Sequence, residues 1–221
     1  MPDQVTLLMR ELVTHDVQRL LLTRPEGLEW RPGQGIELAI DEAPWRDQRR
    51  PFSPTCLLED RILEFTIKRY PEADGVTPAL HALEPGAALL LGEPFGTISY
   101  QGPGTFIAAG TGVTPFLAIL RRLAKDGDLA GHRLLLSNKQ ERDVICREEL
   151  RHYLGDDLVL AFTREHGTAH QPRRIDAAFL DANITDRDGY FYVCGPDDFV
   201  ADVKEALLTL GVPADRLVYE R

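Results

Sequence analysis

The segment Gly110-Thr111-Gly112-Val113-Thr114-Pro115 has the composition of a loop that binds phosphate. Glycines let backbone N–H groups approach a phosphate closely, and the start of a helix adds unpaired N–H donors and the positive end of the helix dipole. The segment follows an apolar run and leads into a helical pattern, with Thr114 as the expected N-cap and Pro115 as the first helical residue. We expect it to bind a dinucleotide pyrophosphate. Its spacing differs from the common G-x-G-x-x-G fingerprint, so a plain tight turn is the alternative.

A second segment, Cys194-Gly195-Pro196, ends a later apolar run of the same half. Ligands of open α/β sheets bind at the carboxyl ends of the strands, so this segment and the glycine loop are expected to share one crevice. A thiol at this place would shape the approach of a bound ring without acting as a nucleophile. A buried cysteine that only packs is the alternative.

Two segments of the first half have the residue types for a second phosphate-containing ligand. The first is Arg50-Pro51-Phe52-Ser53. Arginine offers a fixed fork of donors that matches phosphate oxygens, phenylalanine a flat apolar face and serine a small hydroxyl. The second is Gly75-Val76-Thr77-Pro78, which repeats the design of a helix start, with Thr77 as the expected cap. Ordinary strand surface is the alternative for the first segment.

The elements that must position these segments differ between the two halves. From residue 1 to about 100, short β-type runs are separated by Pro and Gly, and several alternate as half-buried strands do. They lie at residues 4–7, 17–22, 36–40, 54–57, 62–68 and 88–91. Six strands with almost no helix between them predict a small antiparallel β-barrel, interrupted by one short helix after Thr77.

From about residue 104, strands alternate with helical patterns, which predicts a parallel sheet with helices on both faces. The expected strands lie at residues 105–109, 133–136, 158–162, 190–194 and 217–219. The segment Gly102-Pro103-Gly104 is a natural joint. We therefore predict two domains, a barrel over residues 1–101 and an α/β domain over residues 102–221.

Charge and composition exclude several classes of partner. A net charge of −10 argues against nucleic acid, because phosphate binding needs a positive field. No run approaches the ~20 apolar residues needed to span a bilayer. The N-terminus lacks the features of a signal peptide, so a cytoplasmic location is expected.

The cysteines and histidines do not have the pattern of a metal site. Cys56, Cys146 and Cys194 are widely spaced and odd in number, which predicts free thiols and falls short of the four thiolates that an all-cysteine iron–sulfur cluster needs. His166 and His170 are four residues apart, but Gly167 between them makes a helical metal pair unfavourable. No metal is expected, and any iron–sulfur cluster that receives electrons is expected on another protein.

Together and in this order, the four segments resemble the ferredoxin–NADP reductase family over nearly the whole chain. Arg50–Ser53 is similar to the family's flavin motif of Arg, any residue, Tyr, then Ser or Thr, although Phe52 replaces the tyrosine and its phenolic hydrogen bond. Gly75-Val76-Thr77 resembles the flavin-pyrophosphate loop. The glycine loop resembles the nicotinamide-dinucleotide loop, and Cys194-Gly195-Pro196 the motif beside the nicotinamide.

The resemblance implies roles for single residues. Arg50 would pair with a flavin phosphate and Ser53 would hydrogen-bond the reactive N5 edge, while Thr114 and Cys194 would border the nicotinamide. The remaining implied positions are the main chain of Ile67, Lys68 and Arg69 beside the ribityl chain, Thr163 and Arg164 at the 2′-phosphate of NADPH, and Glu220 as a proton relay. For Glu220 a plain surface acid is the alternative, because Tyr219 precedes it instead of ending the chain.

The function implied is a two-domain flavoprotein that passes hydride from NAD(P)H to FAD and then electrons to a separate carrier such as flavodoxin or ferredoxin. FAD is favoured over FMN because the Thr77-Pro78 helix start can hold a pyrophosphate, and NADPH is narrowly favoured over NADH. A reductase component of a multi-protein oxygenase is the first alternative. A non-catalytic regulatory subunit that binds flavin as structure is the second, although the cysteine-rich segment of such subunits is missing from the sequence.

Overall fold

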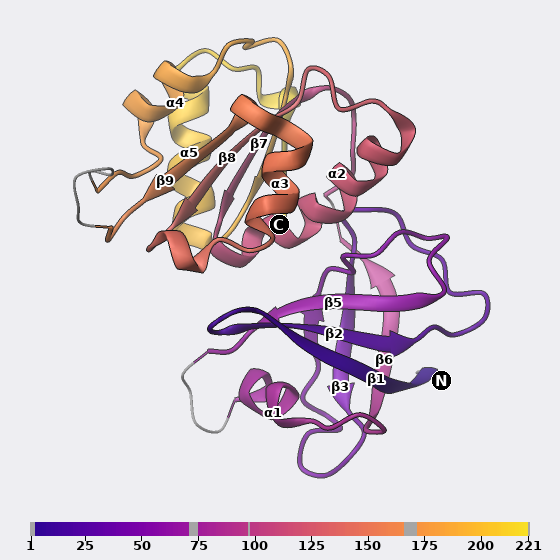
Figure 1. Ribbon diagram of the computed structural model, residues 1–221. Helices are drawn as coiled ribbons and strands as arrows, with labels where there is room; N and C mark the ends of the chain where they lie inside the picture. The colour runs from indigo at the N-terminus through magenta and orange to yellow at the C-terminus, as the bar shows by residue number, and fades with distance from the viewer. Residues whose placement is uncertain (1–2, 71–74, 97, 166–171, 221) are drawn as a thin grey trace.

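The computed structural model describes residues 3–70, 75–96, 98–165 and 172–220, which fold around two separate sheets (Figure 1). The first half of the chain forms a six-stranded antiparallel sheet with the strand order β4-β3-β6-β1-β2-β5. Its elements are β1 (Asp3–Thr14), β2 (Val17–Thr23), β3 (Gly35–Ile40), β4 (Arg50–Phe52), β5 (Ile62–Lys68), α1 (Val76–Ala82) and β6 (Ala88–Phe95).

The edges of this sheet approach each other, as the predicted barrel requires. Pro54, just past β4, forms an antiparallel bridge with Phe65 of β5. On β5 the side chains alternate, so Leu63, Phe65 and Ile67 join the apolar core of the barrel while Glu64 faces outward. This alternation places the Glu64 carboxylate where the second half of the molecule can reach it.

The structure corrects one predicted strand. The fourth strand is Arg50–Phe52, not residues 54–57. The predicted strand at residues 54–57 does not continue because residues 57–60 form a turn. In this turn, Asp60 N–H donates to the Leu57 carbonyl and Leu57 N–H donates to the Asp60 carboxylate. Two other strands are longer than predicted, since β1 continues to Thr14 and β6 to Phe95.

The second half forms a five-stranded sheet in which all pairs are parallel, with the order β11-β10-β7-β8-β9. Its strands are β7 (Gly104–Ala109), β8 (Arg133–Asn138), β9 (Leu158–Phe162), β10 (Tyr190–Cys194) and β11 (Leu217–Tyr219). Its helices are α2 (Thr114–Asp126), α3 (Arg147–Leu154), α4 (Ala177–Asn183) and α5 (Asp197–Thr209).

Helices cover both faces of the parallel sheet, as predicted. One apolar core contains Phe106 of β7 with Phe116 of α2 and Leu150 of α3. The neighbouring β7 residue, Ile107, points to the other face, into the core that contains Leu207 of α5. The predicted two-part fold is thereby confirmed.

The connection between the sheets is held by one buried tyrosine. The Tyr192 hydroxyl accepts hydrogen bonds from the N–H groups of Gln101 (2.9 Å) and Gly102 (3.0 Å), and donates one to the Gly102 carbonyl (2.7 Å). Tyr192 belongs to β10, so the segment that leads into β7 is fixed to the parallel sheet. Within the described ranges, no helix combines the length and apolar character needed to cross a membrane.

Candidate functional site

A hollow lies where the barrel faces the carboxyl ends of the parallel strands. Its barrel side is lined by Gly35, Pro51, Phe52, Ser53, Thr66, Ile67, Lys68 and Tyr70. Its other side is lined by Thr111, Gly112, Thr114, Pro115, Cys194, Gly195 and Glu220. Predicted site residues from both halves, far apart in the sequence, thus share one hollow.

A second hollow continues from the first along the barrel. It is lined by Arg50, Gly75, Val76 and Thr77, together with Pro51, Phe52 and Tyr70, which also line the first. The two measure about 250 Å³ and 400 Å³. The second falls within, and the first just below, the size range of about 300–1,000 Å³ that is typical of cofactor sites.

The glycine loop and the Cys194 segment touch each other. A Cβ atom at Gly112 would lie only 2.2 Å from the Cys194 carbonyl oxygen, so this position requires glycine. Gly110 has a φ of 54°, in the left-handed region that favours glycine. Both motifs therefore depend on one close backbone contact at the carboxyl edge of β7 and β10.

The structure corrects the two predicted helix caps. The glycine loop is a 3₁₀ turn over Gly110–Val113 that runs directly into α2, so Thr114 is the first residue of α2 and not its cap. The Thr114 hydroxyl donates to the Thr111 carbonyl at 2.9 Å. Because the turn is continuous with the helix, the N–H groups without a helical acceptor lie in the glycine loop itself.

The second corrected cap concerns α1. The N-cap is Gly75 and not Thr77, which lies within the first turn. The Thr77 hydroxyl instead accepts a hydrogen bond from the Tyr70 N–H at 3.1 Å. A hydroxyl that holds the strand-to-helix loop is not available to the helix N-terminus.

The thiol of Cys194 is protonated at neutral pH. Burial, and to a lesser extent the negative charge of Glu220, raises the pKa of this thiol to about 12. A thiol in this state is a weak nucleophile. Glu220 itself is exposed at the rim of the hollow.

Five predicted residues line neither hollow: Arg69, Gly110, Thr163, Arg164 and Pro196. Arg69 is exposed, and its N–H donates to the Asp16 carbonyl. Pro196 is the N-cap of α5.

Thr163 and Arg164 follow β9, and their N–H groups donate to the carbonyls of Asn138 and Lys139 at the end of β8. They lie at the same carboxyl edge of the sheet as the glycine loop, two strands away from that loop and three strands away from the Cys194 segment in the strand order. His166 and His170 lie outside the described residues. In the part of the chain that the structure describes, no group of three or more His, Cys, Asp and Glu could hold a metal ion.

Tyr70 is a site residue that the sequence interpretation missed. Its hydroxyl lies 3.3 Å from the Thr111 hydroxyl, so it joins the barrel to the glycine loop, and its ring lines both hollows. The available signal was an aromatic residue two positions after the predicted strand that ends at Lys68. Its importance depends on the approach of Thr111, 41 positions away.

Comparison with known proteins agrees with this geometry. Residues 106–205 match the model of the oxidoreductase NAD-binding domain. This match places an oxidoreductase NAD-binding domain within the second half of the chain, over residues 106–205. Over 96% of its length the chain is 28% identical to the reductase component of propane 2-monooxygenase from Rhodococcus jostii, and it covers 61% of that relative.

Two further relatives also match both halves of the chain. The chain is 27% identical to the ferredoxin–NAD(P)(+) reductase component of the naphthalene 1,2-dioxygenase system from Pseudomonas putida, over 96% of this chain and 66% of that one. The flavohem-like FAD/NAD-binding domain of nitric oxide dioxygenase from Vibrio cholerae has a TM-score of 0.83 and 25% identity, with 98% and 97% of the two chains covered.

The predicted resemblance is confirmed, since these homologues are ferredoxin reductase-like FAD/NAD-binding proteins. The oxidoreductase domain spans residues 106–205, and the chain as a whole spans somewhat less than two thirds of the two curated relatives compared.

Proposed function

We propose that the protein is a flavin-dependent oxidoreductase that takes a hydride from NAD(P)H and passes the electrons to a separate carrier protein. The observation that carries this proposal is the single hollow lined by Phe52 and Ser53 on one side and by Thr114 and Cys194 on the other. A flavin and a nicotinamide that bind there would meet face to face, which is the arrangement that hydride transfer requires. We also propose residues 1–101 and 102–221 as the two domains.

The residues present fit FAD. The guanidinium of Arg50 suits a phosphate, and the first turn of α1 at Gly75–Thr77 has N–H groups without a helical acceptor for a pyrophosphate. Phe52 offers a face for the ring system, and the Ser53 hydroxyl a hydrogen bond to its N5 edge. When bound, FAD supplies the redox chemistry, since it accepts a hydride and returns the electrons one at a time.

The other side of the hollow would hold the reduced nicotinamide. Thr111 and Gly112 present the backbone of the glycine loop to the pyrophosphate, while Thr114 and the neutral thiol of Cys194 border the ring. The role proposed for Glu220 is to exchange protons with solvent at the rim. These residues bind and orient, and no described side chain is required as a nucleophile.

Anaerobic mixing with a reduced nicotinamide tests the proposal. Protein supplied with FAD should show the flavin absorption bands and lose them when NADPH or NADH is added. Ser53→Ala should slow this bleaching while FAD remains bound, because only the N5 contact is lost. A protein that does not take up FAD, or whose flavin is not bleached by either nicotinamide, contradicts the proposed activity.

For the nicotinamide we propose NADPH over NADH. Arg164, exposed at the carboxyl end of β9, supports NADPH because an arginine there suits a phosphate dianion. Arg164→Ala should weaken NADPH binding much more than NADH binding. Equal effects on the two would remove the 2′-phosphate role.

For the electron acceptor we propose flavodoxin, ferredoxin or the iron–sulfur component of an oxygenase. The name of the first relative, a monooxygenase reductase component, supports an oxygenase component, and the name of the second, a ferredoxin–NAD(P)(+) reductase component of a dioxygenase system, supports ferredoxin. Oxidation of the reduced protein by each purified carrier, followed at the flavin bands, distinguishes them. We propose a cytoplasmic location.

A further inference from the structure

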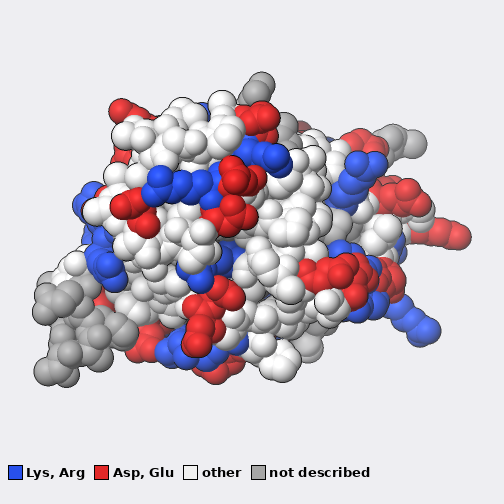
Figure 2. Space-filling view, turned by 90° about the horizontal axis from the view of Figure 1, so that it is seen from above, with Lys and Arg blue, Asp and Glu red and all other residues white. Residues whose placement is uncertain are grey.

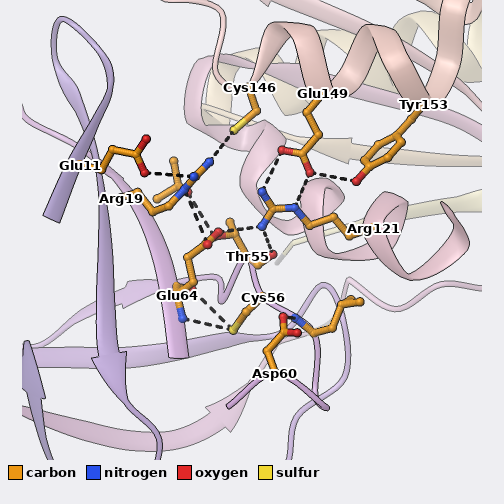
Figure 3. Close-up of polar contacts among 12 residues, drawn as sticks. Glu11, Arg19, Thr55, Cys56, Asp60, Glu64, Arg121, Cys146, Glu149 and Tyr153 are labelled. Atoms are coloured by element: carbon orange, nitrogen blue, oxygen red, sulfur yellow. Dashed lines mark hydrogen bonds and ion pairs between the residues drawn. The ribbon is translucent and has the colours of Figure 1, made fainter. Parts of the chain in front are cut away.

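A half-buried arginine joins the two halves of the molecule. Arg121 lies on α2, and its guanidinium contacts both the barrel and α3 (Figure 3). Its side chain is 15% exposed, and its main barrel partner, Glu64 of β5, is 13% exposed. Burial alone would lower the pKa of this guanidinium, but hydrogen bonds to Glu149 and the charge of Glu64 raise it above its ordinary value. Arg121 is therefore permanently charged.

The hydrogen bonds of the Arg121 guanidinium fix its orientation between the two halves. Its Nε and Nη2 donate to the two oxygens of Glu149 at 2.6 and 2.9 Å, which is a bidentate pair within the nucleotide half. Its Nη1 donates across to the Glu64 carboxylate at 2.7 Å and to the Thr55 carbonyl at 2.6 Å. Since the guanidinium is planar and Glu149 fixes its plane, the position of Nη1 determines where the barrel can sit.

The barrel partners of Arg121 lie within a few residues of side chains that line the hollow. Thr55 follows Ser53 by two residues, and Glu64 precedes the lining residues Thr66 and Ile67 on the same strand. The Thr55 hydroxyl also bonds Glu64 at 2.7 Å and lies 3.2 Å from the Thr66 hydroxyl. On the other side, α2 begins at the lining residue Thr114, which is seven positions or about 10 Å along the helix from Arg121.

Other contacts between the halves fix the barrel less firmly than Arg121 does. Two of them are single, longer hydrogen bonds, between the Tyr70 and Thr111 hydroxyls at 3.3 Å and from Arg19 Nη2 to the Cys146 sulfur at 3.6 Å. Val17 and Ile98 of the first half belong to the same apolar cluster as Phe116 of α2, but apolar contact is non-directional. Arg122 and Lys125 both pair with Glu59 on the surface, where ion pairs are screened. His15 lies 3.7 Å from Asp143, beyond hydrogen-bond distance.

We propose that Arg121 is a positioning residue that sets the distance between the flavin-side wall and the nicotinamide-side wall of the hollow. This inference rests on the proposed function. Hydride transfer requires the reacting atoms about 3–3.5 Å apart, and a misplacement of about 1 Å costs up to about a hundredfold in rate. Arg121 lines neither hollow, so its expected effect is on the transfer step and not on the binding of either nucleotide.

Stopped-flow bleaching of the FAD-loaded protein at saturating NADPH or NADH, whichever reduces the native protein, tests this inference. Arg121→Gln should lower the transfer rate by about tenfold or more, while FAD content and nicotinamide affinity stay unchanged. Arg121→Lys keeps the charge but loses the fork, so an intermediate rate is expected. Arg122→Gln, a change at the next helix position, removes surface ion pairs with Glu59 of the barrel and with Asp126 of the same helix; it is the matched control and should leave the rate unchanged.

Scanning calorimetry of the same variants provides a second readout. The native chain should unfold in a single transition, and Arg121→Gln should broaden or split it, because the variant loses a directional contact between the halves while the shared apolar cluster remains. A native rate and a single transition in Arg121→Gln would overturn the inference.

Two further controls distinguish loss of the positioning role of Arg121 from misfolding and from absence of the proposed activity. If Arg121→Gln does not fold, Glu64→Ala removes the carboxylate that Arg121 contacts across the halves and leaves only the contact with the Thr55 carbonyl; an unchanged rate in that variant would overturn the inference. Loss of rate with equal loss of nicotinamide affinity would also overturn it. A native protein that no reduced nicotinamide bleaches contradicts the proposed function instead, whatever the calorimetry shows.

Discussion

Cys194 is a buried thiol at the meeting point of two functional segments. Its carbonyl oxygen lies so close to Gly112 that no side chain fits there, and its thiol lines the hollow. Burial and the nearby Glu220 carboxylate raise the pKa of the thiol to about 12. The chemistry available at this residue is therefore steric, since almost no thiolate forms near neutral pH.

The state of Cys194 leads to a prediction on its reactivity. Under native conditions at about pH 8, iodoacetamide should alkylate Cys194 at least about a hundredfold more slowly than a free cysteine of pKa near 8.5. The rate should rise steadily with pH up to the highest value at which the protein stays folded, because the folded pKa is not yet reached. Peptide mass spectrometry separates Cys194 from Cys56 and Cys146. A fast reaction that levels off near pH 9 would contradict the assignment.

At the level of elements, the pairing of α2 with α3 depends on Arg121 and Glu149. The Arg121 hydrogen bonds outweigh the effect of burial and lower the pKa of the Glu149 carboxyl below its ordinary value of 4.5. A carboxyl whose folded pKa is lowered stabilises the fold above its unfolded pKa, and this contribution is lost as the pH falls through the folded value. The pair should therefore stabilise the fold fully near neutral pH and progressively less below about pH 4.5.

Glu149→Gln should lower the free energy of unfolding by about 2–3 kcal/mol at pH 7, because it leaves part of the Arg121 charge uncompensated in a half-buried position. The difference from the native protein should shrink as the pH falls from about 5 to 3. Urea unfolding at several pH values measures both effects. Glu148→Gln, an exposed neighbour on the same helix, should change stability by less than about 0.5 kcal/mol. A deficit in Glu149→Gln that does not depend on pH would count against the ion pair.

At the level of the whole molecule, the site consists of surfaces from both halves. On the face shown in Figure 2, basic and acidic side chains are interspersed without a large area of one sign. The hollow depends instead on the way the barrel lies against the parallel sheet (Figure 1). A ligand that bridges these surfaces should stabilise the assembled molecule.

This bridging predicts a thermal shift on ligand binding. FAD at a hundredfold excess over its Kd should stabilise the protein by about 2.7 kcal/mol, or about 5–10 °C in Tm for a chain of this size. Riboflavin, which lacks phosphates, should give a smaller shift because it cannot use Arg50 or the α1 start, and FMN should lie between the two. Equal shifts from all three at equal concentration would show that neither phosphate site is used.

The sequence by itself determined the type of each half and the order of the motifs. Period-two alternation placed β5 at residues 62–68, and uninterrupted apolar runs placed β9, β10 and β11, because these signals depend only on neighbouring residues. The same local signals identified the glycine loop and the Cys194 segment, and their shared position followed from a general rule for parallel sheets.

The tertiary structure alone decided which residues act across the halves. The N-cap of α2 is Val113 and not Thr114, because a 3₁₀ turn runs directly into the helix. The N-cap of α1 is Gly75 and not Thr77, whose hydroxyl accepts a hydrogen bond from the Tyr70 N–H instead. Arg121 and Glu64 are 57 positions apart. Neither residue type nor spacing along the chain predicts such a contact, because it exists only once two independently formed sheets have packed together.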